Sequence, residues 1–339
     1  MDASIINFLS IAVFFTAFVL LYKMCKVWLT TGAAANSVSP KLGPHLYTVC
    51  ESNTCIRCSK NKDILLEALT RLSYHASPSK APDLKNHDSL GSPKVCDRDT
   101  VTSDIKMSLK LLKEKEQSKD PFESPTRKSL TPGHTNPHVF KLSGIRENKF
   151  WSLDDFPALN VLEKCFTQIY LEFIHLYKSD LPETLAFWQR NQTDKGRWDI
   201  LMLVEQGRTT KALEFCPKTM EVLDQIPYLM KGNLFGNAYF SVVHPGTHIS
   251  AHHGSTNCRV RCHLGLVVPF SVENCTLWVD GDSVHWEEGK FIFFNDAFLH
   301  SVEHSGPPSA GYRAVLMLDL WHPDINESQR KILDYAFSN

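Results

Sequence analysis

Histidine and arginine are concentrated in one short stretch of this sequence. Residues 244–266, HPGTHISAHHGSTNCRVRCHLGL, hold five of the 15 histidines and two arginines. Further along, His300 follows the aromatic stretch FIFFNDAFL, and Arg313 is the next arginine after it. Imidazole nitrogens are common metal ligands, and a guanidinium has the shape to hold a carboxylate. These residues predict a metal centre beside an anion-binding residue; the alternative is a polar loop that happens to be rich in histidine.

The spacing of three of these residues is typical of one class of enzyme. His252 precedes His300 by 48 positions, and His300 precedes Arg313 by 13. This is the ligand order of non-haem iron oxygenases that use 2-oxoglutarate. Iron(II) takes imidazole and oxygen ligands on one face, and an arginine holds the far carboxylate of 2-oxoglutarate through two parallel hydrogen bonds. The carboxylate ligand that usually stands two positions after the first histidine is absent, because that residue is Gly254.

Zinc is the competing metal. His248 and His252 are four positions apart, as in helical zinc sites. Pro245, Gly246 and the β-branched residues after them disfavour a helix, so we expect a strand that enters a loop at HHGSTN. A closed tetrahedral zinc site in a barrel would need more ligands, which His248 or His304 could supply.

These residues lie on segments that alternate between polar and apolar side chains. Strands are predicted at 238–243, 259–268, 275–281, 290–296, 299–304 and 312–321. Before them, apolar residues from Leu159 to Leu176 recur at steps of three and four, which predicts one long helix with a buried face. Short strands separated by Gly, Pro, Asn and Asp predict a mainly β fold, a sandwich or an open barrel with a helical layer outside.

Strand alternation sorts the charged side chains onto faces. Arg259, Arg261 and His263 share one face of the strand predicted at 259–268, and Arg313 shares a face with Asp319. A charged residue on a half-buried strand needs a partner. Arg261 and Arg313 are therefore predicted to bind a dianionic small ligand, whereas Arg259 is expected to face solvent.

The N-terminal end predicts a membrane anchor. Residues 5–22 are apolar and uncharged, and Lys23 and Lys26 follow them. A cleaved signal peptide is the alternative, but no basic residue precedes the run. This predicts a short tail at 1–4 and an anchor at 5–22.

Two further segments precede the predicted folded domain at 150–339. Residues 23–75 hold three closely spaced cysteines, which predict a disulfide, unpaired thiols or, with His45, a zinc site; they are Cys50, Cys55 and Cys58. Residues 76–149 are rich in Ser, Pro, Lys and Asp and predict a flexible stalk.

Two opposing signals indicate on which side of the membrane the folded domain lies. Lys23 and Lys26 favour a cytosolic domain. Asn191, Asn274 and Asn326 begin glycosylation sequons, which favour a lumenal domain, and Asn191 is expected in an accessible polar loop. The formal net charge of −1 gives no electrostatic case for nucleic acid.

Three blocks resemble the aspartyl/asparaginyl β-hydroxylase family: HPGTHISAHHGSTNCRVRCHLGLVVP, WEEGKFIFFNDAFLHSVEH and RAVLMLDLWHP. The resemblance covers residues 150–325. It implies a double-stranded β-helix of the jelly-roll or cupin type, which would follow the transmembrane helix and stalk. It also implies iron(II), 2-oxoglutarate and oxygen, and a two-histidine metal site without a carboxylate, which accounts for Gly254.

The resemblance assigns residues as well. It implies His252 and His300 as the metal ligands, with His252 preferred to His253. The implied 2-oxoglutarate shell is Trp198, Ser241, Arg261, His263 and Arg313. It further implies a single-pass type II protein of the endoplasmic reticulum, with a lumenal domain acting on a peptidyl Asp or Asn side chain.

The sequence therefore leads to two hypotheses. The first is a membrane-anchored iron- and 2-oxoglutarate-dependent dioxygenase that hydroxylates a protein substrate. The second is an inactive β-helix domain that serves as a membrane-bound binding or scaffold protein. The presence of His252, His300 and Arg313 together favours the enzyme.

Overall fold

The computed structural model describes residues 68, 70, 71, 133–191 and 193–338. The predicted anchor at 5–22, the three juxtamembrane cysteines and the stalk up to residue 132 lie outside these ranges, so the structure does not test those predictions. Within the described ranges, no helix combines the length and the apolar character needed to cross a membrane.

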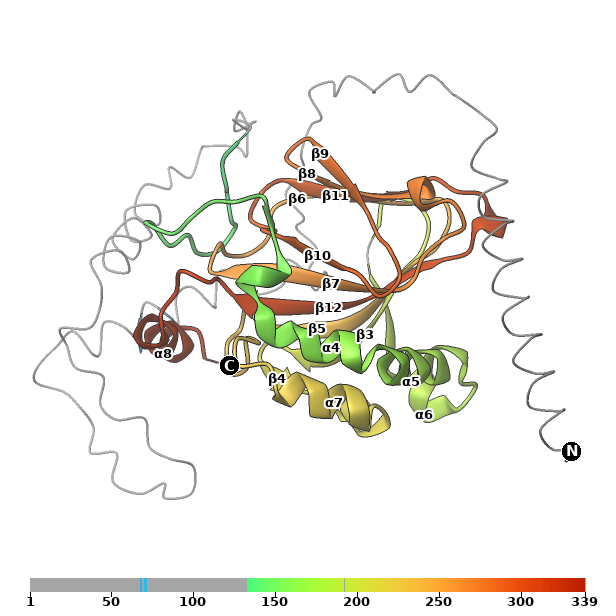
Figure 1. Ribbon diagram of the computed structural model, residues 1–339, viewed down its shortest axis with the longest axis horizontal. Helices are drawn as coiled ribbons and strands as arrows, with labels where there is room; N and C mark the ends of the chain where they lie inside the picture. Colours follow the sequence, from blue (N-terminus) through green and yellow to red (C-terminus); the bar gives the residue numbers. More distant parts are fainter. Residues whose placement is uncertain (1–67, 69, 72–132, 192, 339) are drawn as a thin grey trace, which may run out of the picture. The chain divides into compact units, whose positions relative to one another are not determined.

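An antiparallel sheet of eight strands carries most of the inward-facing residues named above (Figure 1). Its order is β1-β10-β7-β12-β5-β3-β2, and β4 pairs with the end of β3. The strands are β1 (Phe150–Trp151), β2 (Trp188–Asn191), β3 (Trp198–Glu205), β4 (Arg208–Thr209), β5 (Ala238–Val243), β7 (Arg259–Val267), β10 (Phe291–Phe294) and β12 (Arg313–Trp321). Because β12 pairs on both sides, with β5 and β7, it is buried along its whole length.

A second antiparallel sheet lies against the first and has the order β6-β11-β8-β9. Its strands are β6 (Thr247–His252), β8 (Cys275–Val279), β9 (Asp282–His285) and β11 (His300–His304). Apolar side chains from both sheets form one core between them, including Ile200, Ile249, Leu277 and Met317. The mainly β fold predicted from the sequence is confirmed as a two-sheet sandwich.

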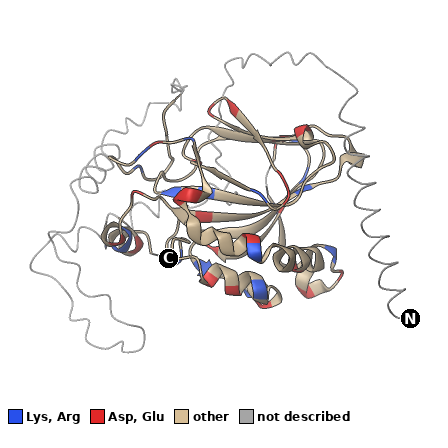
Figure 2. Ribbon diagram, in the orientation of Figure 1, with Lys and Arg blue, Asp and Glu red and all other residues tan. Residues whose placement is uncertain are grey.

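Helices cover the outer face of the larger sheet (Figure 1). They are α4 (Asn160–Lys164), α5 (Phe166–Lys178), α6 (Pro182–Leu185) and α7 (Pro217–Asp224), and α8 (Glu327–Ala336) lies near the C-terminus. Short 3-10 turns occur at η2 (Leu153–Asp155), η3 (Pro157–Leu159), η4 (Lys211–Phe215), η5 (Val272–Asn274) and η6 (Pro308–Ala310). Charged residues of both signs are interspersed along these helices (Figure 2).

The long helix predicted before the strands is correct in its buried face but wrong in its continuity. Ile169, Phe173 and Leu176 of α5 are fully buried against the sheet. The helical path is interrupted at Cys165, which separates α4 from α5. Pro157 begins a separate 3-10 turn, because proline has no amide hydrogen to continue the preceding structure.

All six predicted strands are present, with ends that differ by at most two residues. The strand expected before the HHGSTN loop is β6. The sequence did not indicate β3, because seven of its eight residues are buried and apolar residues occupy both of its faces, with Asp199 among them on the outer face. Alternation, the signal used for the other strands, disappears when both faces of a strand are covered.

The folded region begins before the boundary predicted at residue 150. Backbone amides of His138, Val139 and Phe140 donate to the carbonyls of Gly254 and Ser255, each at 3.0 Å. Phe140 is 1% exposed, so this segment is part of the core. Residues 133–149 therefore belong to the domain and not to the stalk.

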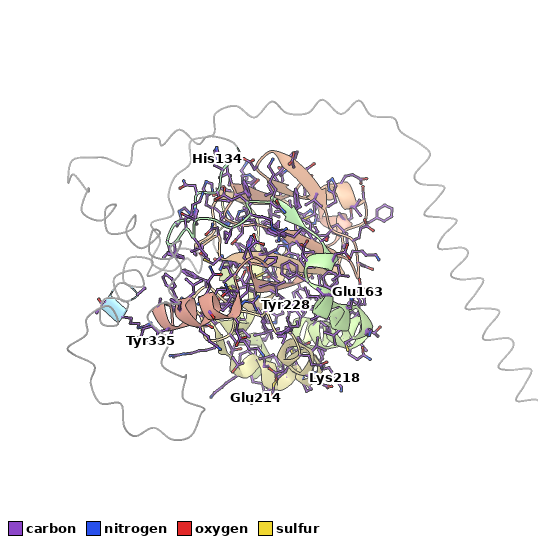
Figure 3. The ribbon with its side chains drawn as sticks, turned by 60° about the vertical axis from the view of Figure 1, so that its left-hand side comes forward. His134, Glu163, Glu214, Lys218, Tyr228 and Tyr335 are labelled. Carbon is purple, nitrogen blue, oxygen red and sulfur yellow. The ribbon has the colours of Figure 1, made fainter. Side chains whose placement is uncertain are left out.

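The described residues that precede the stalk also contact the domain, at α8. Ala68 is 1% exposed and packs in one cluster with Phe337. Nη1 of Arg71 donates to the carbonyl of Ser338 at 2.6 Å and to its hydroxyl at 2.8 Å. This short helical piece lies beside Tyr335 of α8 in Figure 3. An arginine at this position satisfies carbonyl groups that the end of a helix leaves without partners.

Candidate metal and cosubstrate site

His252 and His300 are neighbours across β6 and β11. Their Cα atoms are register partners, and their ring centroids are 4.2 Å apart. In each ring, Nδ1 lies 2.9 Å from the backbone carbonyl oxygen two residues earlier. A carbonyl only accepts, so Nδ1 carries a proton in both rings, and Nε2 is the atom through which either ring would bind a metal. Metal-bound histidines in proteins usually have this arrangement.

The electrostatics of His300 suit a metal ligand. Burial lowers its pKa to about 4, although the nearby Asp296 carboxylate opposes this shift. The imidazole is therefore neutral at pH 7, which is the form that binds a metal.

The side chain of His253 does not join this pair. Its Nδ1 donates to the carbonyl of Ala297 at 2.8 Å, and its ring lies 6.1 Å from that of His138. The structure thus places His252, and not His253, opposite His300.

The two histidines considered as extra zinc ligands have other partners. Nε2 of His304 donates to the carbonyl of Gly311 at 2.9 Å, and Nδ1 accepts from a backbone amide at 3.3 Å. His248 is half-exposed and lies 3.2 Å from the carboxylate of Asp194. In the part of the chain that the structure describes, no three His, Cys, Asp or Glu side chains are grouped to hold a metal.

Arg313 begins β12 and points between the two sheets. It is 2% exposed, its guanidinium stacks 4.5 Å from the ring centroid of Trp286, and Nη1 lies 3.3 Å from the hydroxyl of Ser241. That hydroxyl also accepts from the indole nitrogen of Trp198 at 3.0 Å. Three of the predicted cosubstrate residues, from three adjacent strands, are thus in direct contact.

Arg313 lacks the charge partner that a buried cation needs. Its buried Nε has no hydrogen-bond partner, and no carboxylate among the described residues forms an ion pair with it. Burial lowers the pKa of the guanidinium. Burying a cation without an anion is costly, so this position fits the carboxylate of a bound ligand.

His263 lies on the same inner face and adds a hydrogen-bond donor. The indole of Trp286, which can only donate, contacts Nδ1 of His263 at 3.2 Å. Burial and the nearby Arg313 lower the pKa of His263 well below its ordinary value. A neutral ring that accepts at Nδ1 carries its proton on Nε2. Sequence reasoning missed Trp286, because it directly follows β9 and lies between two predicted strands.

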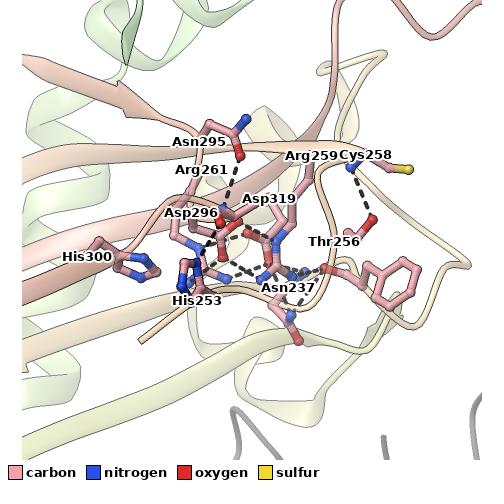
Figure 4. Close-up of polar contacts among 12 residues, drawn as sticks. Asn237, His253, Thr256, Cys258, Arg259, Arg261, Asn295, Asp296, His300 and Asp319 are labelled. Atoms are coloured by element: carbon pink, nitrogen blue, oxygen red, sulfur yellow. Dashed lines mark hydrogen bonds and ion pairs between the residues drawn. The ribbon is translucent and has the colours of Figure 1, made fainter. Parts of the chain in front are cut away.

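A cluster of two arginines and two aspartates fills the end of the sandwich next to His300 (Figure 4). Arg259 pairs with Asp296 at 2.6 Å and with Asp319 at 3.3 Å. Arg261 pairs with Asp319 at 3.0 Å and with Asp296 at 3.2 Å. Both carboxylates are fully buried, and these arginines hold the pKa of Asp296 well below its usual range against the effect of burial.

This cluster corrects one prediction and restricts another. Arg259 does not face solvent: it is 4% exposed, because the face it shares with Arg261 is closed by the two aspartates. Arg261 does point inward as predicted, but its charge is already matched by these carboxylates. The free cation of the site is therefore Arg313 and not Arg261. Asp319 could have been found from its place on the inward face of β12. Asp296 lies beyond the end of β10, which is shorter than the strand predicted at 290–296, so alternation does not set its direction.

Gly254 is explained by the same cluster. A Cβ atom at this position would lie 2.3 Å from Oδ2 and 2.7 Å from Oδ1 of Asp296. Any side chain, including the missing third ligand, would collide with that carboxylate. A carboxylate ligand at position 254 is thus excluded for a spatial reason.

Comparison with known proteins gives a consistent picture. Residues 163–323 match the model of the family described as aspartyl/asparaginyl beta-hydroxylase. Human aspartate beta-hydroxylase domain-containing protein 2 is 33% identical over 298 residues, which is 86% of this chain and 71% of that protein. Human aspartyl/asparaginyl beta-hydroxylase is 38% identical over 154 residues, 45% of this chain and 19% of that protein.

The solved structures that match are more distant. An oxidoreductase of the 2OG-Fe(II) oxygenase family from Burkholderia pseudomallei is 12% identical. The match covers 45% of this chain and 78% of that one, with a TM-score of 0.33. A likeness of this size supports no conclusion about chemistry.

Proposed function

The chain belongs to the aspartyl/asparaginyl beta-hydroxylase family, and from this premise we propose that it is an iron(II)- and 2-oxoglutarate-dependent dioxygenase. Its substrate would be a protein or peptide, hydroxylated on an Asp- or Asn-type side chain. We also infer that the two-sheet sandwich is the double-stranded β-helix of such enzymes. The observation that carries the proposal is Arg313, a buried cation without a carboxylate partner, on the sheet that faces the histidine pair.

The residues of the site fit the cofactors. His300 presents a neutral imidazole, and in both His252 and His300 the atom left to bind iron(II) would be Nε2, because Nδ1 faces a backbone carbonyl. Arg313 would hold the far carboxylate of 2-oxoglutarate, and the hydroxyl of Ser241 and Nε2–H of His263 would donate to it. When bound, iron and 2-oxoglutarate supply the oxidising chemistry: one oxygen atom enters the substrate, and the other converts 2-oxoglutarate to succinate and carbon dioxide.

The chain's own residues arrange and shield this chemistry. The stacked Trp286 ring fixes the plane of the Arg313 guanidinium, so a carboxylate meets two N–H groups with a set direction. The apolar core around Ile249 and Met317 excludes water from the space between the sheets. Arg261, held by two carboxylates, would line the site with one edge of its guanidinium.

The test is succinate formation from 2-oxoglutarate by the purified full-length protein, with added iron(II) and candidate peptides. Succinate that depends on iron, and on His252, is expected. Binding of 2-oxoglutarate without succinate from any peptide would favour the scaffold hypothesis. No binding at all would refute the assignment of Arg313.

We further propose that residues 5–22 anchor the protein in the endoplasmic reticulum membrane, with a lumenal catalytic domain. The sequon argument for this is weaker than the sequence indicated. Asn191 is not in an accessible loop: it ends β2 and is 6% exposed. The amide of Asn274 donates to the carbonyl of Phe270 at 2.8 Å, whereas Asn326 is exposed at the start of α8.

Protease treatment of sealed microsomes tests this placement. A lumenal domain would stay intact until detergent is added, and a glycan at Asn326 would be lost in an Asn326→Gln variant. Digestion of the domain in sealed vesicles would show that it is cytosolic, and would leave the chemistry unaffected.

A further inference from the structure

The three strands that supply the cosubstrate residues end side by side. Trp198 at the start of β3 pairs with Val243 at the end of β5, and Val243 pairs with Arg313 at the start of β12. Trp198 and Arg313 point to the inner face. By strand alternation, their neighbours Asp199 and Tyr312 point to the outer face, toward the helices.

On that outer face, Asp199 ties two of these strand ends together. It is 5% exposed, and its Oδ2 accepts from Nε of Arg197 at 2.6 Å and lies 3.0 Å from Nε2 of His244. Arg197 precedes β3, and His244 follows β5 directly. A backbone hydrogen bond also connects these two strand ends, because the amide of His244 donates to the carbonyl of Arg197 at 3.0 Å.

The third strand end, at the start of β12, contacts the other two through aromatic rings. The hydroxyl of Tyr177, on α5, lies 3.4 Å from Nε2 of His244. The ring of Tyr177 is 4.8 Å from that of Tyr312, the residue before Arg313, and Tyr312 is 6.2 Å from His244. We call Tyr177, Arg197, Asp199, His244 and Tyr312 the outer-face cluster.

We propose that the outer-face cluster, with Asp199 at its centre, positions Trp198, Ser241 and Arg313 and thereby sets the affinity for 2-oxoglutarate. Asp199 is a positioning residue, because it acts through the strand ends and does not touch the ligand. This inference rests on the proposed function. Its physical basis is that the buried Asp199 carboxylate binds groups from both strand ends. Removing it leaves the mostly buried His244 without this acceptor and releases the half-exposed Arg197 into solvent, so the two strand ends lose their side-chain link.

Burial alone would raise the pKa of the Asp199 carboxyl. Hydrogen bonds from His244 and Arg197 reverse that effect and lower it below its ordinary value. The carboxylate is therefore charged at neutral pH and holds both partners. Arg190 is also near, at 3.7 Å, but it is 67% exposed and contributes little.

The test compares Asp199→Ala and His244→Ala with wild type in anaerobic binding of 2-oxoglutarate to the iron(II)-loaded full-length protein. Dissociation constants are expected to rise about three- to tenfold, the range for residues that act through a packed network. Turnover at saturating 2-oxoglutarate should stay within about twofold of wild type, because the metal ligands are unchanged. Asp199→Asn, which keeps an acceptor oxygen, should restore part of the affinity.

Two controls separate positioning from loss of stability. Glu172→Gln removes a carboxylate that accepts from Lys218 and Thr219 of α7, so it should lower the unfolding midpoint without changing 2-oxoglutarate affinity. Arg190→Ala should change neither the unfolding midpoint nor the affinity for 2-oxoglutarate. A second readout is the 15N-indole NMR signal of Trp198, assigned with Trp198→Phe, which should shift in Asp199→Ala and not in Glu172→Gln.

The outcomes are distinguishable. If the Asp199 and His244 variants bind 2-oxoglutarate as wild type does, or if Glu172→Gln weakens binding equally, the positioning role is overturned and the proposed function stands. If wild-type protein binds no 2-oxoglutarate, the proposed function is overturned, and this inference with it.

Discussion

Replacing Gly254 with alanine tests whether space, and not backbone conformation, requires glycine beside the proposed metal site. Gly254 does not have a positive φ, so alanine meets no backbone penalty there. The new Cβ would lie 2.3 Å from Oδ2 and 2.5 Å from Cγ of Asp296. That carboxylate cannot move away freely, because Arg259 holds it at 2.6 Å and Arg261 at 3.2 Å.

The expected cost follows from these contacts. Overpacking a tight site costs about 1–3 kcal/mol, and breaking a buried ion pair costs about 3–5 kcal/mol. Since the cluster can relax partly, Gly254→Ala should reduce the free energy of unfolding by about 2–4 kcal/mol. Urea denaturation measures this change in the free energy of unfolding. The change is calculated from the shift in the urea midpoint, provided that the dependence of the free energy on urea concentration stays the same.

A double-mutant cycle identifies the cause. Asp296→Ala removes the atoms that a Cβ would strike, so in that background Gly254→Ala should cost much less than in wild type, with a coupling of at least about 1 kcal/mol. Ser255→Ala, one residue away, is the matched control and should be near neutral. A loss below about 0.5 kcal/mol for Gly254→Ala, or additive effects in the cycle, would refute the spatial explanation.

Other predictions concern the ligands and one helix. His252→Ala or His300→Ala should abolish iron(II) binding in a metal titration, whereas His253→Ala should not; the reverse pattern would show that the ligand is misassigned by one residue. Arg313→Lys should raise the apparent Michaelis constant for 2-oxoglutarate about tenfold or more, because an ammonium cannot reproduce the flat guanidinium that stacks on Trp286. Unchanged cosubstrate dependence in steady-state kinetics would contradict this. Burial raises the pKa of Asp334 to about 6, so its protonated form stabilises the fold at low pH and this contribution is lost as the pH rises through about 6. Asp334→Asn should therefore raise the urea midpoint at pH 7.5 and leave it nearly unchanged at pH 4; an equal effect at both pH values would rule out titration as the cause.

The sequence predicted those parts of the fold that follow from local patterns. Alternation in β7 and β12 assigned Arg261, His263 and Arg313 to the inner face, and the structure places all three there. Leu264 and the apolar residues that alternate with them lie on the opposite face, where they pack in the core under the helices. A side chain's face depends only on the parity of its position, which a sequence displays directly.

What the sequence missed depends on contacts between distant segments. The burial of Arg259 follows from Asp296, 37 positions away, and from Asp319, 60 positions away. The burial of Phe140 depends on the loop after β6. Neither contact leaves a periodic signal. Asn326 and Gln329 form a capping box that marks the start of α8, and this local signal was available in the sequence.

The contact of Ala68 and Arg71 with the C-terminal end of α8 changes what the length of the Ser/Pro-rich segment means. Arg71 contacts Ser338, and Gly133 contacts Asp280 of the same domain. Both contacts hold only if the two residues stay near one body, whatever number of residues separates them. That number therefore enters only as the entropy of closing a loop, which grows slowly with chain length.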